Sequence, residues 1–117
     1  MSISGASKMV IMIVIALSSG FAIAKGNADN GKSLYAAKCA TCHGPAGKGD
    51  GVAAASLTPK PRDLTDNAYM KTLSDQQLAD VLKKGGAAVG KSPLMPASGL
   101  KDEEIPDMVA FLRTLSK

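Results

Sequence analysis

The residues best able to do chemistry in this sequence form one short run, Cys39-Ala40-Thr41-Cys42-His43. Positions three and four residues apart share one face of a helical turn, so the two thiols and the imidazole would point the same way. Two thiols at this spacing can form thioethers with the two vinyl groups of one haem, and the adjacent imidazole can then bind the iron. The pattern C-x-x-C-H is typical of such covalent haem attachment.

The same two cysteines have two other uses to be weighed. A redox disulfide of the thioredoxin type is expected beside a strand–helix unit, and no segment alternates with period two for long enough to predict a strand. A zinc site needs a fourth ligand beyond two Cys and one His, and the chain contains no further cysteine or histidine. Haem is therefore favoured, and it would also fill the core of a chain whose aromatic residues are 2 Tyr, 2 Phe and no Trp.

The residue on the other face of the iron decides between functions. An open site binds small ligands or activates peroxide, whereas an iron with two protein ligands mainly passes electrons. Met108 lies on the apolar stripe of a predicted helix and Met70 directly precedes another, where packing explains both. Met95 lies in Pro93-Leu94-Met95-Pro96, a loop where helix packing does not explain a long thioether. The sequence favours Met95 as the distal ligand, with packing as its alternative.

The first 24 residues predict an export signal. Lys8 gives a positive start, residues 9–17 are apolar, and Ala22-Ile23-Ala24 has the small-x-small pattern of a signal-peptidase site. A membrane anchor is the alternative, but the uncharged stretch before Lys25 is shorter than the ~20 residues that a spanning helix needs. We expect a signal peptide at 1–24 and a single exported, periplasmic domain at 25–117.

A domain of that length buries a modest fraction of its surface and is marginally stable without help, which small domains commonly find in disulfides, a metal or a cofactor. We therefore expect the haem-free polypeptide to be largely unfolded. The whole chain carries 14 basic and 10 acidic side chains, and its lysines are scattered. Scattered charge does not favour nucleic-acid binding, which clusters basic residues in a stripe or motif. A mildly basic face for an acidic protein partner is the simpler interpretation.

Hydrophobic periodicity predicts a small all-α domain. Helices are expected over residues 28–39, from residue 75 to a stop at Gly85-Gly86, and over residues 102–116. Ser74 and Gln77 form a capping-box pattern before the second of these. A further short helix through Tyr69 is weakly marked, and the glycine-rich and proline-rich segments between the helices read as loops.

Taken together, residues 27–117 resemble a soluble class I cytochrome c of the small bacterial type. The motifs that carry the resemblance are Cys39-Ala40-Thr41-Cys42-His43-Gly44, Gly47-Lys48-Gly49-Asp50-Gly51, Pro61-Arg62-Asp63-Leu64, Gly85-Gly86 and Lys91-Ser92-Pro93-Leu94-Met95-Pro96. The resemblance implies three to five short helices wrapped around one haem c. It implies thioethers at Cys39 and Cys42, His43 as proximal ligand and Met95 as distal ligand.

The resemblance also implies that the first and last helices cross, with Gly31 allowing close approach and Tyr35 meeting Phe111. Three residues depart from the family pattern. Ser98 replaces a frequent aromatic residue, so the haem is expected to be more exposed on that side. Val52 replaces a frequent proline, which leaves open the carbonyl that accepts the ring N–H of His43. Lys101 replaces a usual Ser or Thr cap, with Asp102 as the expected substitute.

The function expected from this resemblance is that of a periplasmic single-electron carrier and not of an enzyme. Its iron would cycle between Fe(II) and Fe(III). Expected partners are a quinol-oxidising complex, a terminal oxidase or a periplasmic dehydrogenase, met in transient complexes by a monomer with no small-molecule substrate. Arg62 is expected either near a haem propionate or solvated on the surface. The alternatives are an open-site haem enzyme or gas sensor, and a haem subunit fixed in a larger respiratory complex.

Overall fold

A computed structural model describes residues 25–116, so the predicted export signal at 1–24 lies outside the described residues and stays a prediction. All regular structure in the described part is helical, which confirms the all-α prediction. The α-helices are α1 (Ala28–Lys38), α2 (Ala40–His43), α3 (Asn67–Met70), α4 (Asp75–Lys84) and α5 (Ile105–Leu115), and short 3₁₀ turns occupy Ala54–Ser56, Ala87–Val89 and Asp102–Glu104. Across residues 25–116 no helix has the length and apolar character needed to cross a membrane.

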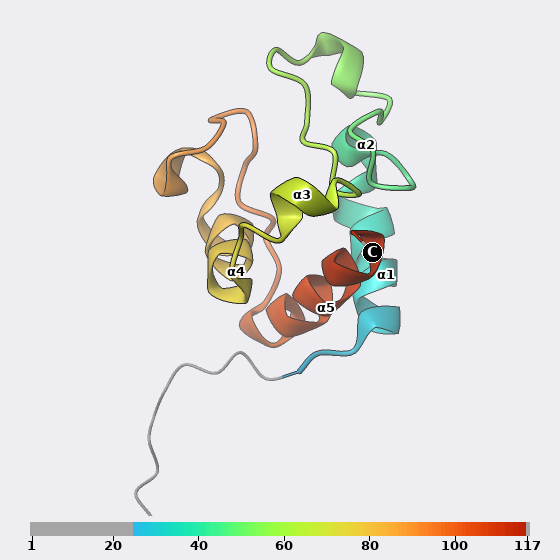
Figure 1. Cartoon of the computed structure of the whole chain (residues 1–117), viewed down its shortest axis with the longest axis vertical. Coiled ribbons are helices and arrows are strands. Elements are labelled where there is room, and N and C mark those ends of the chain that lie inside the picture. Colours follow the sequence, from blue (N-terminus) through green and yellow to red (C-terminus); the bar gives the residue numbers. More distant parts are fainter. Residues whose placement is uncertain (1–24, 117) are drawn as a thin grey trace, which may run out of the picture.

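The first and last helices, α1 and α5, pack against each other and form the centre of the fold (Figure 1). Gly31 lies at the contact, where a Cβ would overlap the Asp107 carbonyl oxygen and come 2.8 Å from the Cβ of Phe111. The rings of Tyr35 and Phe111 meet there with centroids 5.2 Å apart. The expected helix crossing and its aromatic pair are therefore confirmed.

A polar contact fixes the N-terminal ends of the same two helices. The side chain of Asn27 caps α1 by accepting a hydrogen bond from the Asp29 N–H at 2.9 Å. The Asp107 carboxylate accepts from the amide of Asn30 at 2.6 Å and from the Asn27 N–H at 2.7 Å. These two hydrogen bonds, the one from Asn30 first, hold the pKa of Asp107 below its usual value.

Helix α4 begins and ends where the sequence predicts. The hydroxyl of Ser74 accepts from the Gln77 N–H at 3.0 Å, while the Gln77 side chain accepts from the Ser74 N–H at 2.8 Å. Gly85 ends the helix with a φ of 83°, a conformation that favours glycine. The buried side chains of Leu78 and Leu82 then pack into the common core.

The guanidinium of Arg113 ties α5 to the connection between α3 and α4. It donates to the backbone carbonyls of Met70 at 2.9 Å and Leu73 at 2.6 Å, and to the carboxylate of Asp75 at 2.9 Å. Met70 is the last residue of α3, and Leu73 lies in the turn between α3 and α4. One side chain on α5 therefore supplies donors to a segment 38 to 43 residues earlier in the chain.

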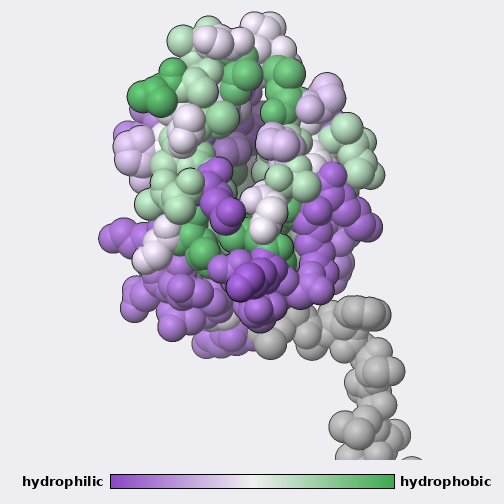
Figure 2. Space-filling model, turned by 180° about the vertical axis from the view of Figure 1, so that it is seen from behind, coloured by the Kyte–Doolittle hydropathy of each residue, from purple (hydrophilic) through white to green (hydrophobic). Residues whose placement is uncertain are grey.

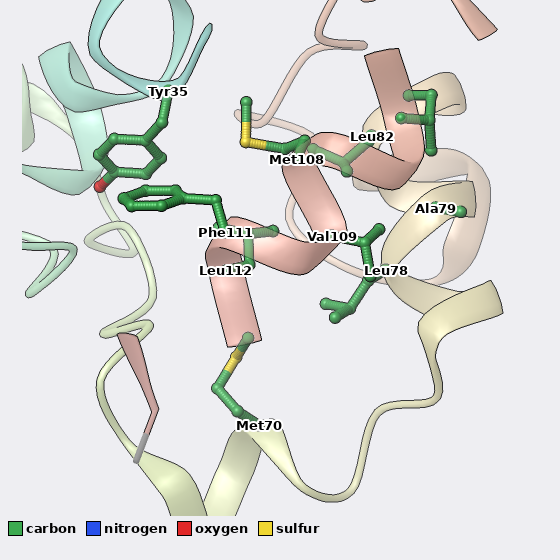
Figure 3. Packing of buried hydrophobic residues seen from close by; sticks show 10 residues of the cluster. Tyr35, Met70, Leu78, Ala79, Leu82, Met108, Val109, Phe111 and Leu112 are labelled. Carbon is green, nitrogen blue, oxygen red and sulfur yellow. The ribbon is translucent and has the colours of Figure 1, made fainter. Parts of the chain in front are cut away.

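The core is a cluster contributed by α1, α3, α4 and α5 (Figure 3). Met70 and Met108 are completely buried within it, and Met70 points toward α5 in the close view. Their interpretation as packing residues is confirmed. Buried thioethers fill irregular gaps well because the side chain is unbranched and flexible.

The start of the last helix differs from the expectation that Asp102 would cap it. Lys101 occupies the N-cap position, and its backbone N–H donates to the carboxylate of Glu104 at 2.9 Å. Asp102 instead forms an exposed ion pair with Lys83 at 3.1 Å. The expected cap is wrong because the 3₁₀ turn that leads into α5 already begins at Asp102, which leaves Lys101 at the N-cap position.

Candidate functional site

Cys39, Cys42 and His43 lie on one turn of backbone where α1 passes into α2. Cys39 ends the first helix and begins the second, and its carbonyl accepts from the N–H groups of Cys42 at 3.3 Å and His43 at 2.9 Å. All three side chains are half-buried and line one cavity. Burial raises the pKa of the Cys39 thiol to about 11, an effect that the charge of Lys38 opposes.

The imidazole of His43 is oriented by a backbone carbonyl 19 residues away. Its Nδ1 lies 3.0 Å from the carbonyl oxygen of Arg62. Burial lowers the pKa of His43, and the hydrogen bond to Arg62 opposes this shift. A neutral imidazole that donates through Nδ1 keeps the lone pair on Nε2 for a metal ion. The sequence left this acceptor open, and the structure identifies it as Arg62.

A glycine-rich loop holds the Arg62 carbonyl in place. The N–H of Gly49 donates to the His43 carbonyl at 2.7 Å, and the N–H of Leu64 donates to the Gly47 carbonyl at 2.6 Å. Gly49 has a φ of 81°, and a Cβ there would overlap the carbonyl oxygen of Pro61. Glycine at this position lets the loop that follows His43 pack directly against the segment that contains Arg62.

Met95 lies in the loop that forms the opposite wall of the same cavity. Its carbonyl accepts from the N–H of Gly86 at 2.9 Å, and its own N–H donates to Ser92 at 3.3 Å. A Cβ on Gly86 would overlap the carbonyl oxygen of Ser92, so glycine at this position allows the Met95 loop to pack against the end of α4. Among the described methionines, Met95 shares a cavity with His43, whereas Met70 and Met108 lie in the core.

Ser98 closes the same loop onto α4. Its hydroxyl and its N–H both donate to the carbonyl of Leu82, at 2.7 Å and 2.8 Å. The residue lines the cavity with a short polar side chain. An aromatic side chain at this position would cover more of the cavity wall than serine does.

The cavity has a volume of about 560 Å³, and its walls are mainly apolar. Figure 2 shows a hollow between hydrophobic surfaces in the upper half of the molecule, with hydrophilic residues gathered below it. Four cationic residues and no carboxylate line the cavity; the four are Lys38, Lys60, Arg62 and Lys91. Two thiols, one imidazole and one thioether also line it. These groups fit a large, planar, apolar macrocycle that carries a metal and acidic substituents.

Arg62 lines this cavity and is not isolated on the surface. Its guanidinium carbon lies 3.5 Å from the centroid of the Tyr69 ring, and the amine of Lys91 lies 3.0 Å from the Tyr69 hydroxyl. Sequence reasoning did not identify Tyr69, which lies on a weakly marked helix. The proximity of these three side chains depends on tertiary structure and leaves no local signal.

Comparison with known proteins gives a consistent result over the described residues. The family model described as Cytochrome c matches residues 28–116. Cytochrome c-554(547) from Halothiobacillus neapolitanus is 35% identical over 94 residues, which cover 77% of this chain and 98% of the relative. Thiosulfate dehydrogenase from Psychrobacter arcticus is 30% identical over 95 residues, 78% of this chain and 27% of the relative.

One solved structure is also similar. A chain of the reducing HAO-like protein complex from Kuenenia stuttgartiensis superposes with a TM-score of 0.62 at 27% identity. The match covers 79% of this chain and 44% of that one. This chain therefore spans nearly all of one relative and a minor part of two longer proteins.

Proposed function

This chain belongs to the cytochrome c family, and on that premise we propose that it carries single electrons between redox proteins in the periplasm. The proposal depends chiefly on one observation: Cys39, Cys42, His43 and Met95 line the same cavity. We assign Cys39 and Cys42 to the two thioethers, His43 to the proximal position and Met95 to the distal position. The bound haem c would supply a one-electron Fe(II)/Fe(III) couple, whose potential a thioether ligand raises.

The protein's contribution is to hold two ligands in fixed positions. The Arg62 carbonyl keeps the proton of His43 on Nδ1 and directs Nε2 toward the cavity. The Gly86–Met95 hydrogen bond and the Ser98–Leu82 hydrogen bonds hold the opposite wall at its two ends. Ligands that keep their places in both oxidation states keep the reorganisation between those states small.

The rim of the cavity supports docking to acidic partners. Lys38, Lys60 and Lys91 are exposed there, and the cavity lining contains no carboxylate to offset them. Uncompensated charge of one sign steers an oppositely charged protein and speeds encounter by 10- to 1,000-fold in order of magnitude. Candidate partners are a quinol-oxidising complex, a terminal oxidase or a periplasmic dehydrogenase. The thiosulfate dehydrogenase relative is itself a redox enzyme, which supports the last of these.

Two experiments test the carrier. A potentiometric titration of the purified holoprotein should follow a one-electron curve, and the ferrous protein should resist added CO. Ready binding of CO would contradict the proposal and favour an open-site enzyme or gas sensor. The rate of electron transfer to an acidic redox protein should fall on raising the salt concentration and on replacing Lys38 and Lys60 by Gln. The matched control replaces two exposed lysines outside the cavity, namely Lys32 and Lys48.

A second candidate is a haem subunit fixed in a larger enzyme. It is favoured by the two matches in which this chain covers 27% and 44% of a longer protein. Gel filtration of native periplasmic extract separates the candidates, because a free carrier elutes near the mass of its monomer. The same preparation tests export, since mass spectrometry should find Lys25 as the first residue and a mass increase of one haem.

A further inference from the structure

Tyr69 lies between the two walls of the cavity and contacts a cation from each. The guanidinium of Arg62, on the wall that holds His43, covers one face of its ring with the carbon 3.5 Å from the centroid. The amine of Lys91, at the start of the opposite loop, lies 3.0 Å from its hydroxyl oxygen and 5.5 Å from the ring centroid. One half-buried side chain thus bridges segments that are 29 residues apart in the chain.

Each cation is also connected through its own backbone to one side of the site. The carbonyl of Arg62 accepts from His43 Nδ1 at 3.0 Å. The N–H of Lys91 donates to the Gly86 carbonyl at 2.8 Å, and the N–H of Gly86 donates to the Met95 carbonyl at 2.9 Å. A continuous series of contacts therefore runs from the imidazole on one wall to the thioether loop on the other.

These contacts are directional electrostatic contacts and not general packing. We call the three side chains of Arg62, Tyr69 and Lys91 the tie. A guanidinium over a ring face and an ammonium on a phenolic oxygen are both attracted electrostatically. Neither cation forms an ion pair with a carboxylate among the described residues. Among the described residues, the Lys91 amine donates to the Tyr69 hydroxyl and pairs with no carboxylate. The contact closes the loop at its N-terminal end, whereas Ser98 closes it at the other end.

We propose that Arg62, Tyr69 and Lys91 are positioning residues that hold the Met95 loop closed against the wall carrying His43. This inference rests on the proposed function, in which Met95 is the distal ligand. The tie sets the equilibrium between a closed loop and an opened one that exposes the distal position. A small base competing for that position gains access in proportion to the opened population.

Imidazole is a suitable probe because it is neutral and displaces a methionine ligand from ferric haem. Tyr69→Phe keeps the ring under Arg62 and removes the hydroxyl, while Lys91→Met removes the donor. Because Lys91 is exposed, loss of this partly solvated hydrogen bond should raise the apparent affinity for imidazole by about 5- to 10-fold in each variant. Lys91→Arg, which keeps a cationic donor, should restore most of the wild-type affinity.

Two controls separate the tie from other effects. Lys32→Met removes an exposed positive charge on α1 that does not line the cavity, so imidazole affinity should stay within about twofold of wild type. Asn30→Ala removes the hydrogen bond to Asp107 at the N-terminal ends of α1 and α5, away from α3 and from this loop, and should lower the unfolding midpoint without changing imidazole affinity. Titrations use the purified ferric holoprotein. They follow the loss of the weak absorption band in the red that a methionine ligand gives to ferric haem.

The outcomes distinguish failure of the tie from failure of the assignment of Met95 as distal ligand. Tighter imidazole binding in Tyr69→Phe and Lys91→Met, with both controls unchanged, supports the tie. If the wild type shows the methionine–iron band and Met95→Ala loses it, but Tyr69→Phe and Lys91→Met bind imidazole like wild type, the tie is wrong and the ligand assignment stands. If wild type and Met95→Ala bind imidazole equally, the ligand assignment fails, and the tie fails with it.

Discussion

Replacing Gly31 by Ala tests the helix crossing on which the fold is built. Taken alone, the change should stabilise α1 by about 1 kcal/mol, because alanine loses less conformational entropy than glycine in a helix. The structure predicts the opposite sign. The added methyl group would overlap the carbonyl oxygen of Asp107 and lie 2.8 Å from the Cβ of Phe111. A backbone carbonyl inside a helix cannot rotate away, so α1 and α5 must separate.

The magnitude follows from the size of that separation. Restoring a normal contact moves the helices apart by roughly 1 Å, which forfeits a quarter to a half of the dispersion attraction along the crossing. The Tyr35–Phe111 pair, whose ring centroids are 5.2 Å apart, lies in the same contact. Aromatic pairs of this kind contribute about 0.5 to 1.5 kcal/mol beyond their buried area. Overpacking costs about 1 to 3 kcal/mol and the weakened pair adds to it, so after the helix-propensity gain the net loss is about 0.5 to 3 kcal/mol.

The assay is denaturant unfolding of the ferric holoprotein followed by circular dichroism. Ser33→Ala is the matched control, because Ser33 is exposed on the same helix and the change alters helix propensity alone. It should stabilise by about 0.5 kcal/mol or less. The predicted overlap between the added methyl group and α5 is refuted if Gly31→Ala stabilises the protein as Ser33→Ala does.

Three further predictions concern stability. Arg113→Met should destabilise the protein by about 2 kcal/mol, because two backbone carbonyls lose a charged donor. Lys83→Met breaks the more exposed of the two ion pairs and should cost under about 0.5 kcal/mol. Equal losses of the two variants in chemical denaturation would contradict this. Because hydrogen bonds lower the pKa of Asp107 in the folded state, its stabilising effect is present above the unfolded pKa of about 4 and is lost as the pH falls through the folded pKa. The stability difference between wild type and Asp107→Asn should therefore be constant above about pH 5 and shrink below about pH 4, and a pH-independent difference would argue against this carboxylate contact. Haem-free polypeptide should give the circular dichroism of a largely unfolded chain, so a cooperative, native-like melt would show that the protein core suffices alone.

Features set by neighbouring residues were predictable from the sequence. The capping box of Ser74 and Gln77 spans one turn, and the stop at Gly85 follows directly from a glycine after an amphipathic segment. The common face of Cys39, Cys42 and His43 is likewise a consequence of helical spacing. Each of these depends on a few consecutive residues, so tertiary structure had little opportunity to change it.

Features that join distant segments were not predictable in the same way. The acceptor for His43 is a backbone carbonyl, which every residue possesses, so nothing in the type of residue 62 marks it. The ion pair between Asp102 and Lys83 joins two helices in the same way, and no local pattern marks it. Tyr69 escaped notice because its partners, Arg62 and Lys91, are brought to it by the fold.

The methionines show how structure and sequence combine. Sequence position alone favoured Met95 and left packing as an alternative for it. Complete burial of Met70 and Met108 in the core explains those two side chains without a ligand role. Met95 is the remaining described methionine and lines the cavity with His43. Met95 is therefore the one described methionine left as a candidate distal ligand, and a single substitution can test it.

The most direct test of the account is the visible spectrum of the ferric protein in three forms: wild type, Met95→Leu and Met70→Leu. Leucine conserves volume at the buried position, so Met70→Leu serves as the matched control. The account predicts a weak red methionine–iron band in wild type and in Met70→Leu, and its loss in Met95→Leu. A band that survives in Met95→Leu, or a wild-type protein that lacks it and binds CO readily when reduced, would contradict the proposed ligand and the carrier function with it.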